Sequence, residues 1–249
     1  MKVFEKLIVP DEKRVFFVGD IHGAFDLYLK GVRDLGITDE DVVISLGDLV
    51  DRGDKNVQAV EEFTKKENRY AIIGNHEDMM IKGMLEGSMQ HFECWFLNGG
   101  AQTWEEVGGE AGSRLLAEMV KDLPIILEVE HQGKTFGCVH GGIPYFRREE
   151  KNWEDVVVKA SKHENYVHDL IWDRSVIDHI QMCINAEEFI PAVEGVDFVL
   201  HGHTPVKQPL IVQNRIYMDT GGIFSSKLTF AWYENEKLNF YTTGDYDTL

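Results

Sequence analysis

The chain has 249 residues, 43% of them hydrophobic, which suits one globular domain with a sizeable core. Its 43 acidic residues outnumber its 25 basic ones, and the net charge of -18 repels nucleic acid and anionic membranes, so neither is an expected partner. The N-terminal segment has no apolar stretch of signal-peptide length, and no run approaches the about 18 apolar residues of a membrane span, so we expect a cytoplasmic protein.

The first half of the chain alternates short apolar runs with segments of helical period, which indicates an α/β fold. Apolar residues recur every three or four positions over 25–35 and 57–63, which predicts helices with one buried face. Runs rich in Val, Ile and Phe predict five strands, at 14–19, 41–47, 69–74, 134–140 and 196–202. Beyond residue 205, alternating runs on both sides of Asn235-Glu236 predict antiparallel strands joined as a hairpin.

Residues 144–195 differ from the rest, because they are rich in charged residues and histidine and show no clean period. We interpret them as a helical excursion over one face, which is a candidate lid. No low-complexity linker or internal repeat divides the chain. We therefore expect residues 1–249 to form a single domain.

Each of the five predicted strands runs into a polar motif that contains glycine. The motifs are, in chain order, GDIHG (19–23), GDLVDRG (47–53), GNHE (74–77), HGG (140–142) and HGHTP (201–205). Any one of them has a simpler explanation, such as a helix cap at Asp20. Open α/β sheets place their sites at the carboxyl ends of strands, so five motifs at five such ends indicate one shared site.

The side chains in these motifs suit metal binding. Aspartate, histidine and asparagine form a mixed oxygen and nitrogen set that fits Mn, Fe or Zn, and no cysteine lies in the motifs. The candidates are too many for one ion. A pair of metals about 3.5 to 4 Å apart can hold both the attacking and the leaving oxygen of a phosphoryl transfer.

Taken in order, the five motifs resemble those of the phosphoprotein phosphatase family, within the calcineurin-like metallophosphoesterases. The branch of the bacteriophage lambda protein phosphatase and its bacterial relatives also shares segments similar to WFLNGG (95–100), IWDR (171–174) and YMDTGGIF (217–224). The resemblance covers nearly the whole chain. It implies an α/β (α+β) calcineurin-like fold with a central β-sandwich of mixed sheets flanked by helices, and two divalent metal ions, with Mn²⁺ expected and Fe or Zn acceptable.

The resemblance also assigns metal ligands by position. It implies that the first metal is bound by Asp20 and His22, that Asp48 bridges both metals, and that the second is bound by Asn75, His140 and His203. His201 lies two residues before the last of these ligands. We interpret it as a neighbour of the site or a strand-end histidine, because the ligand of the family follows a small residue, as His203 follows Gly202.

Four further residues receive catalytic roles from the resemblance. Arg52 and Arg174 are expected to bind the substrate phosphate, for which the planar guanidinium is suited. His76 is the expected general acid that protonates the leaving alkoxide, and Asp51 is expected to orient it. The implied reaction is hydrolysis of phosphoserine or phosphothreonine in a phosphorylated protein, by direct attack of a hydroxide that bridges the metals. Phosphotyrosine, phosphohistidine and small phosphomonoesters are further candidate substrates.

Two alternatives remain open at this point. A diadenosine tetraphosphate hydrolase would use the same metals, but that group typically has alanine in the place of Asp51 and aspartate in the place of Glu77. A non-catalytic module that binds phosphoproteins would be expected to have lost a ligand or the acid, yet every expected position is filled.

Overall fold

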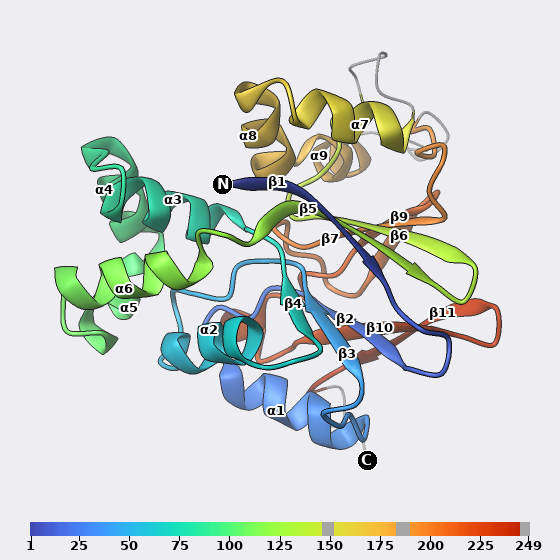
Figure 1. Ribbon diagram of the computed structural model, residues 1–249, viewed down its shortest axis with the longest axis horizontal. Helices are drawn as coiled ribbons and strands as arrows, with labels where there is room; N and C mark the ends of the chain where they lie inside the picture. The colour runs from blue at the N-terminus through green and yellow to red at the C-terminus, as the bar shows by residue number, and fades with distance from the viewer. Residues whose placement is uncertain (146–151, 183–189, 245–249) are drawn as a thin grey trace.

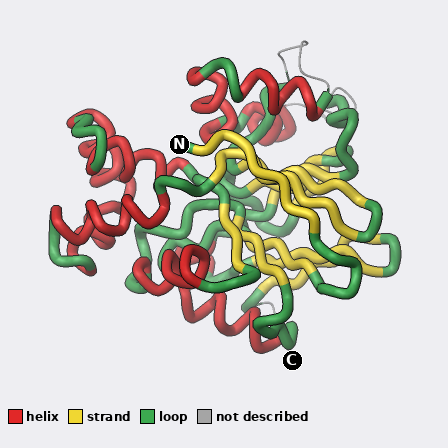
Figure 2. The backbone as a smooth tube through the Cα atoms, viewed as in Figure 1, coloured by secondary structure: helices red, strands yellow, loops and turns green. Residues whose placement is uncertain are grey.

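The computed structural model describes residues 1–145, 152–182 and 190–244. Two mixed β-sheets stack face to face in its centre (Figures 1 and 2). One sheet has the order β1-β5-β6-β7-β9-β8 and the other the order β11-β10-β2-β3-β4. This architecture confirms the expected sandwich of mixed sheets flanked by helices.

Six strands form the first sheet: β1 (Lys2–Ile8), β5 (Pro124–His131), β6 (Lys134–Val139), β7 (Phe198–His201), β8 (Leu210–Val212) and β9 (Arg215–Tyr217). Five strands form the second: β2 (Val15–Val18), β3 (Val42–Ser45), β4 (Arg69–Ala71), β10 (Thr229–Glu234) and β11 (Lys237–Thr242). All five predicted strands and the hairpin of β10 and β11 are confirmed. The strand analysis did not include β1 and β5, which pair in parallel at the edge of the first sheet.

Helices cover the sandwich in three groups (Figure 1). Below the second sheet lie α1 (Phe25–Asp34) and α2 (Asn56–Lys65), as the apolar period predicted. To one side lie α3 (Asn75–Met84), α4 (Met89–Trp95), the π-helical turn η1 (Phe96–Gly100), α5 (Ala101–Glu106) and α6 (Glu110–Val120). Above the first sheet lie α7 (Trp153–Ala160), α8 (Glu164–Trp172) and α9 (Ser175–Met182), and the short α10 (Gly222–Ser225) precedes β10.

The predicted excursion at 144–195 contains the helices α7, α8 and α9, while its described residues at 190–195 are not helical. Its segments 146–151 and 183–189 lie outside the described residues. Among the helices that are described, none is long and apolar enough to cross a membrane.

The apolar core has two parts because the inner strands are buried on both faces. Phe17 and Ile44 of the second sheet pack between the sheets with Leu127 and Phe136 of the first. Phe16, Val18 and Val43 point the other way, toward α1 and α2. Alternate side chains of a strand point to opposite faces, so a run of consecutive apolar residues is what such a strand requires.

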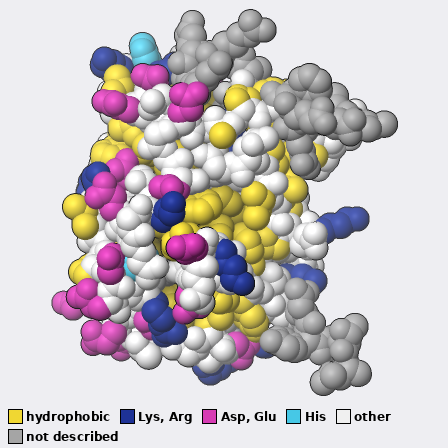
Figure 3. Space-filling view, turned by 90° about the vertical axis from the view of Figure 1, so that its right-hand side faces the viewer, with side chains coloured by type: hydrophobic (Ala, Val, Ile, Leu, Met, Phe, Trp, Pro, Cys, Tyr) yellow, Lys and Arg dark blue, Asp and Glu magenta, His cyan; other side chains and the backbone are white. Residues whose placement is uncertain are grey.

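The amino ends of β2 and β3 lie on the side of the β-hairpin turns, which Figure 3 shows face on. Apolar side chains are exposed in the middle of this face between charged ones, and a shallow hollow there is lined in part by Phe16, Trp232 and Tyr233. The predicted metal ligands, and with them Asp51, Arg52 and His76, follow the carboxyl ends of strands, whereas Arg174 lies between α8 and α9. The candidate site therefore lies at the opposite end of the sandwich.

Candidate metal centre

The five motifs meet where both sheets end. The loops after β2, β3 and β4 come from the second sheet, and those after β6 and β7 come from the first. The amide of His203 donates to both carboxylate oxygens of Asp20, at 2.9 and 3.1 Å, and Nε2 of His140 lies 3.3 Å from Oδ2 of Asp48. These contacts connect residues 183 and 92 positions apart, so the site exists only once the two sheets are stacked.

The loops adopt unusual backbone conformations at the site residues themselves. The φ angles are 47° at His22, 49° at Asp48 and 64° at His203, all in the left-handed region that side chains disfavour. Such strained residues concentrate at functional sites, where the surrounding structure fixes them. The glycines leave room for the carboxylates, because a Cβ at Gly74 or Gly202 would collide with Oδ1 of Asp48 or Asp20, respectively.

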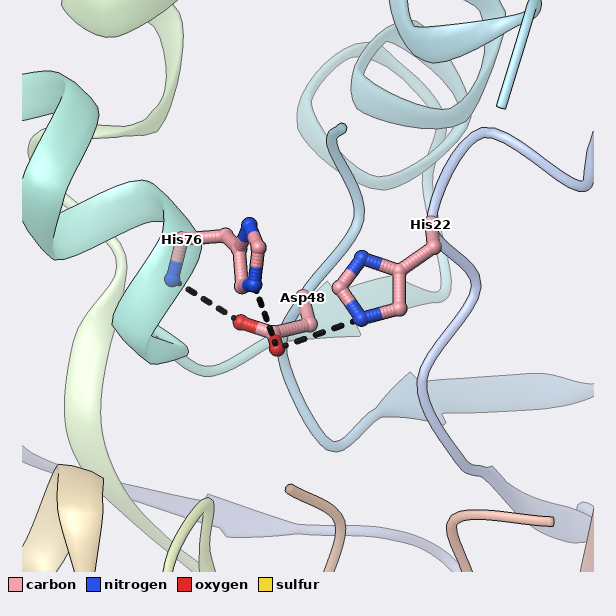
Figure 4. A group of neighbouring side chains, drawn as sticks. All are labelled: His22, Asp48 and His76. Carbon is pink, nitrogen blue, oxygen red and sulfur yellow. Dashed lines mark hydrogen bonds and ion pairs between the residues drawn. The ribbon is translucent and has the colours of Figure 1, made fainter. Parts of the chain in front are cut away.

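Asp48 is the shared member of two clusters that could hold metal ions. One cluster joins it to His22 and His76, the other to His140 and His203, and the ligand atoms within each lie within 4.8 Å of one another. Figure 4 shows the first cluster, with the two imidazoles approaching the Asp48 carboxylate from opposite sides. A carboxylate common to both clusters is in the position that a bridging ligand requires.

The other two predicted ligands differ in their placement. Oδ1 of Asn75, the first residue of α3, lies 3.1 Å from Nε2 of His140 and 2.8 Å from Nδ1 of His203, beside the second cluster. Asp20 belongs to neither cluster by distance, but its carboxylate faces the backbone of His203. All six predicted ligands are thus brought to one place and are buried.

The electrostatics of this place favour cations. Burial and the neighbouring carboxylates of Asp219 and Asp48 raise the pKa of Asp20, which shows that negative charge is crowded here. Burial lowers the pKa of His22 to about 3 and that of His203 to about 2, so both imidazoles are neutral at pH 7. Neutral imidazole is the form that binds metals. Burial also lowers the pKa of His140, but the carboxylates of Asp48 and Asp20 outweigh it and raise this pKa to about 10, so in the metal-free protein a proton on His140 balances these acids. The donor types, their burial and the negative charge around them fit a pair of divalent ions.

His76 lies at the start of α3 and is paired with Asp51. Its Nδ1 lies 2.6 Å from Oδ2 of Asp51, while Oδ1 of the same carboxylate accepts from Nε1 of Trp95 at 2.9 Å and from Oγ1 of Thr103 at 2.6 Å. Burial lowers the pKa of His76, but the carboxylates of Asp48 and Asp51 outweigh it and raise this pKa overall. Because Asp51 accepts bonds on both oxygens, the imidazole is fixed in one orientation.

The two predicted phosphate-binding arginines lie at the mouth of the site. The guanidinium of Arg52 places Nη1 2.5 Å from Nε2 of His22 and Nη2 2.9 Å from Nε2 of His76. The amide of Arg52 donates to the carbonyl of Gly99 in η1. Arg174, between α8 and α9, is exposed and its Nε donates to Nε2 of His203 at 3.1 Å. The two cations thus contact opposite sides of the centre.

His201, which we did not expect to be a ligand, is buried outside both clusters. Its Nδ1 bonds the carbonyl of Val139 at 2.7 Å, and its ring stacks on Tyr217 with centroids 4.8 Å apart. It therefore lies next to the site in sequence but takes part in the packing of β7 against β9.

The sequence analysis missed three residues that hold the site together. The buried carboxylate of Glu77 accepts from the amides of Asp48, Leu49, Val50 and Gly74, so it connects the loop after β3 to the start of α3. Its position three residues after a helix N-cap is a capping-box signal that could have indicated this role. Trp95 and Thr103 carry no comparable signal, since their contact with Asp51 spans 44 and 52 residues.

The chain is similar in sequence to known phosphoesterases and phosphatases. Residues 13–207 match the family model described as calcineurin-like phosphoesterase. Serine/threonine-protein phosphatase 1 of Salmonella typhimurium is 26% identical over 232 residues, which cover 92% of this chain and 96% of that protein. A bis(5'-nucleosyl)-tetraphosphatase PrpE of Bacillus velezensis is also 26% identical, over 92% of this chain and 93% of that protein.

A similar fold is found among solved structures. The cold-active protein-tyrosine phosphatase of a psychrophilic Shewanella species aligns over 97% of this chain and 83% of its own, with a TM-score of 0.65. Only 15% of the aligned residues are identical, so the likeness concerns the fold.

Proposed function

The chain belongs to the calcineurin-like phosphoesterase family, and from this premise we propose that it is a dimetal phosphomonoesterase that removes phosphate from serine and threonine side chains of proteins. Members of the family hydrolyse phosphate esters with a dimetal centre. The family match and the bacterial serine/threonine phosphatase relative support the hydrolase class directly. The protein substrate is the further step, and it rests on the way the site protonates a leaving group.

In this proposal the six buried ligands hold two divalent ions, with Mn²⁺ as the expected metal. Asp20 and His22 would hold one ion, Asn75, His140 and His203 would hold the other, and Asp48, the member common to both clusters, would contribute to both. When bound, such a pair supplies Lewis-acid charge to the phosphoryl group and a nucleophilic water of lowered pKa. Glu77 fixes the backbone on which Asp48 sits, so the bridging carboxylate is held before the metals arrive.

The observation that carries the proposal is the pairing of His76 with Asp51. A serine or threonine alkoxide is a poor leaving group and needs a proton in the transition state, whereas a nucleotide phosphate is far less basic. The carboxylate of Asp51 accepts a hydrogen bond from Nδ1–H of His76 and thereby stabilises the doubly protonated ring, whose Nε2–H can donate to the alkoxide. Asp51, Trp95 and Thr103 thus hold His76 in position to donate this proton. Such a site is suited to a phosphomonoester of an alcohol.

Arg52 and Arg174 bind the phosphate in this proposal. Their guanidinium groups lie on opposite sides of the metal ligands and offer planar forks to the phosphoryl oxygens. Because Arg174 joins α8 to α9, the helical segment above the first sheet would take part in substrate binding, which supports its proposed role as a lid. The whole chain then acts as one catalytic domain.

The test compares kcat/KM for a phosphothreonine peptide with that for diadenosine tetraphosphate, using protein loaded with Mn²⁺. We expect the peptide to be preferred and the variant His76→Asn to lose most of the rate, which excludes a contaminating phosphatase. A preference for the dinucleotide would leave the metal centre in place but overturn the substrate assignment. If neither substrate is turned over, the non-catalytic phosphoprotein-binding module becomes the better explanation.

The second candidate function is hydrolysis of bis(5'-nucleosyl) tetraphosphates. It is favoured by relatives that carry this name at 24 to 26% identity over about nine tenths of this chain. Asp51 and Glu77 disfavour it, because that group typically has alanine in the place of Asp51 and aspartate in the place of Glu77. In this chain both side chains make several hydrogen bonds within the site. The same pair of substrates decides between the two functions.

A further inference from the structure

We propose that Phe224, an aromatic residue outside the five motifs, is a positioning residue that holds the guanidinium of Arg52 by a cation–π contact and so raises the affinity of the site for phosphate. The proposal rests on the proposed function, since Arg52 is taken to bind the phosphate. The Cζ atom of Arg52 lies over the Phe224 ring, 5.5 Å from the ring centroid. This distance is within the about 6 Å over which an aromatic face attracts a guanidinium.

Phe224 lies on α10, a single turn that is fixed against the site. Gly221, which precedes this turn, has a φ angle of 91°, a conformation that favours glycine. The amides of Phe224 and Ser225 donate to the carbonyl of Gly221, at 2.8 and 3.3 Å. A Cβ at Gly222 would lie 3.1 Å from the carbonyl oxygen of Asp20, so the turn lies directly against the loop of a predicted metal ligand.

The side chain of Phe224 is nevertheless 78% exposed. Single exposed apolar side chains are common on protein surfaces, so exposure alone assigns no role to this ring. What distinguishes Phe224 is that its ring contacts a cation of the site from a backbone that is held in place.

On the other side, η1 fixes the backbone and the stem of Arg52. The φ angle of Arg52 is 71°, and its amide donates to the carbonyl of Gly99 at 3.3 Å. A Cβ at Gly99 would lie 2.7 Å from Cγ of Arg52, so η1 packs against the start of the side chain. Neither contact reaches the guanidinium, whose place therefore depends on contacts of its own.

The hydrogen bonds of this guanidinium involve two nitrogens that the proposed reaction needs. Nη1 and Nη2 of Arg52 lie 2.5 Å from Nε2 of His22 and 2.9 Å from Nε2 of His76. Nδ1 of His22 already bonds the carbonyl of Val50, so Nε2, which faces the Asp48 carboxylate in Figure 4, is the atom left to bind a metal. In doubly protonated His76 Nε2 is a donor and cannot accept from Arg52. Both hydrogen bonds are therefore lost in the loaded site with a charged His76.

The contact with Phe224 survives these changes, because an aromatic face attracts a cation without a lone pair or a proton of the site. Within the residues that the structure describes, Arg52 forms no ion pair with a carboxylate. A carboxylate would occupy the N–H groups that bind phosphate, whereas an aromatic face can attract the guanidinium and leave these groups to the substrate. Phe224 thus suits a phosphate-binding arginine.

The test measures the dissociation constant of inorganic phosphate by calorimetry in the full chain loaded with Mn²⁺. Phe224→Leu keeps an apolar side chain but removes the ring, so it should weaken phosphate binding about two- to fivefold, the size of a cation–π contact at an exposed site. KM for p-nitrophenyl phosphate should rise by the same factor while kcat stays within about twofold. Phe224→Tyr, which keeps the ring, should bind phosphate as tightly as the wild type.

A graded series separates the charge distribution of the ring from its shape. Phenylalanine with one, two or three ring fluorines at position 224 stays apolar and similar in size, while each fluorine withdraws electron density from the face that attracts the cation. The logarithm of the affinity for phosphate should fall in steps along this series. In the background of Arg52→Ala, neither the series nor Phe224→Leu should have a further effect.

Phe198 supplies the matched control. Its half-buried ring lies at the amino end of β7, away from the site, and stacks on Phe136 with centroids 5.3 Å apart. Phe198→Leu and the same fluorine series at that position should leave the affinity for phosphate unchanged.

Three results would overturn the positioning role. Phe224→Leu could weaken phosphate binding by the same factor with and without the side chain of Arg52, or it could lower only the melting temperature. The third is a fluorine series with constant affinity, because it would show that the electron density of the ring has no effect on Arg52.

Two further outcomes separate this inference from the proposed function. If Arg52→Ala binds phosphate as tightly as the wild type, the proposed role of Arg52 is wrong and the inference falls with it. If Arg52→Ala weakens binding but Phe224→Leu does not, only the inference fails.

Discussion

Replacing Asp51 by asparagine should separate proton donation from every other function of the site. The wild-type carboxylate accepts on both oxygens, with Trp95 and Thr103 on Oδ1 and His76 on Oδ2. An indole N–H cannot accept a hydrogen bond, so the carboxamide oxygen of the variant must remain opposite Trp95. Its NH₂ group then faces Nδ1 of His76.

This exchange forces the imidazole into the wrong protonation pattern. Nδ1 of His76 must accept from the amide, so the neutral ring carries its proton on Nε2 and the doubly protonated ring is disfavoured. General acid catalysis contributes about 10²- to 10⁴-fold, which is about 3 to 5 kcal/mol of transition-state stabilisation. We expect a loss of this size for a phosphothreonine peptide, whose alkoxide needs the proton.

The assay compares two substrates that differ in their leaving group. p-Nitrophenolate leaves readily without a proton, so Asp51→Asn should reduce kcat for p-nitrophenyl phosphate less than tenfold. Asp78→Asn is the control. Asp78 is a buried acid on α3, the helix of His76, but it pairs with Lys82 and not with a site residue. Equal losses for both substrates, or an unchanged rate with the peptide, would refute the reasoning.

Three further changes test the residues that hold the site in place and the bound metals. Glu77→Gln places an NH₂ group against backbone amides that donate hydrogen bonds to the wild-type carboxylate, so the free energy of unfolding in urea should fall by about 2 to 3 kcal/mol. An unchanged value would contradict the role of Glu77. Gly202→Ala should displace Asp20 and weaken Mn²⁺ binding in calorimetry, whereas Gly36→Ala, with open space around it, should not. Removal of both metals with EDTA should lower the melting temperature by about 10 to 20 °C, since each ion at about 100 times its dissociation constant stabilises by about 2.7 kcal/mol; a constant melting temperature would show that the ions do not stabilise the fold.

The sequence alone predicted the kind of site and most of the residues that the structure brings together there. Each motif is local, because a buried strand, a glycine and a polar residue follow one another within a few positions. The five predicted strands and the helices α1 and α2 are confirmed for the same reason, since the apolar period of each is visible in a short window. The order of the motifs was enough to indicate the family, which the family model confirms.

Only the tertiary structure decided which groups hold these members in place. Trp95 and Thr103 reach Asp51 across 44 and 52 residues, and Glu77 reaches the amide of Asp48 across 29. No periodicity connects positions so far apart, because their contact arises from the stacking of two sheets and three groups of helices. The candidate ligands could be proposed from the sequence because they lie in motifs that resemble those of the family and because metal chemistry restricts them to a few residue types, whereas almost any polar side chain can serve as a support.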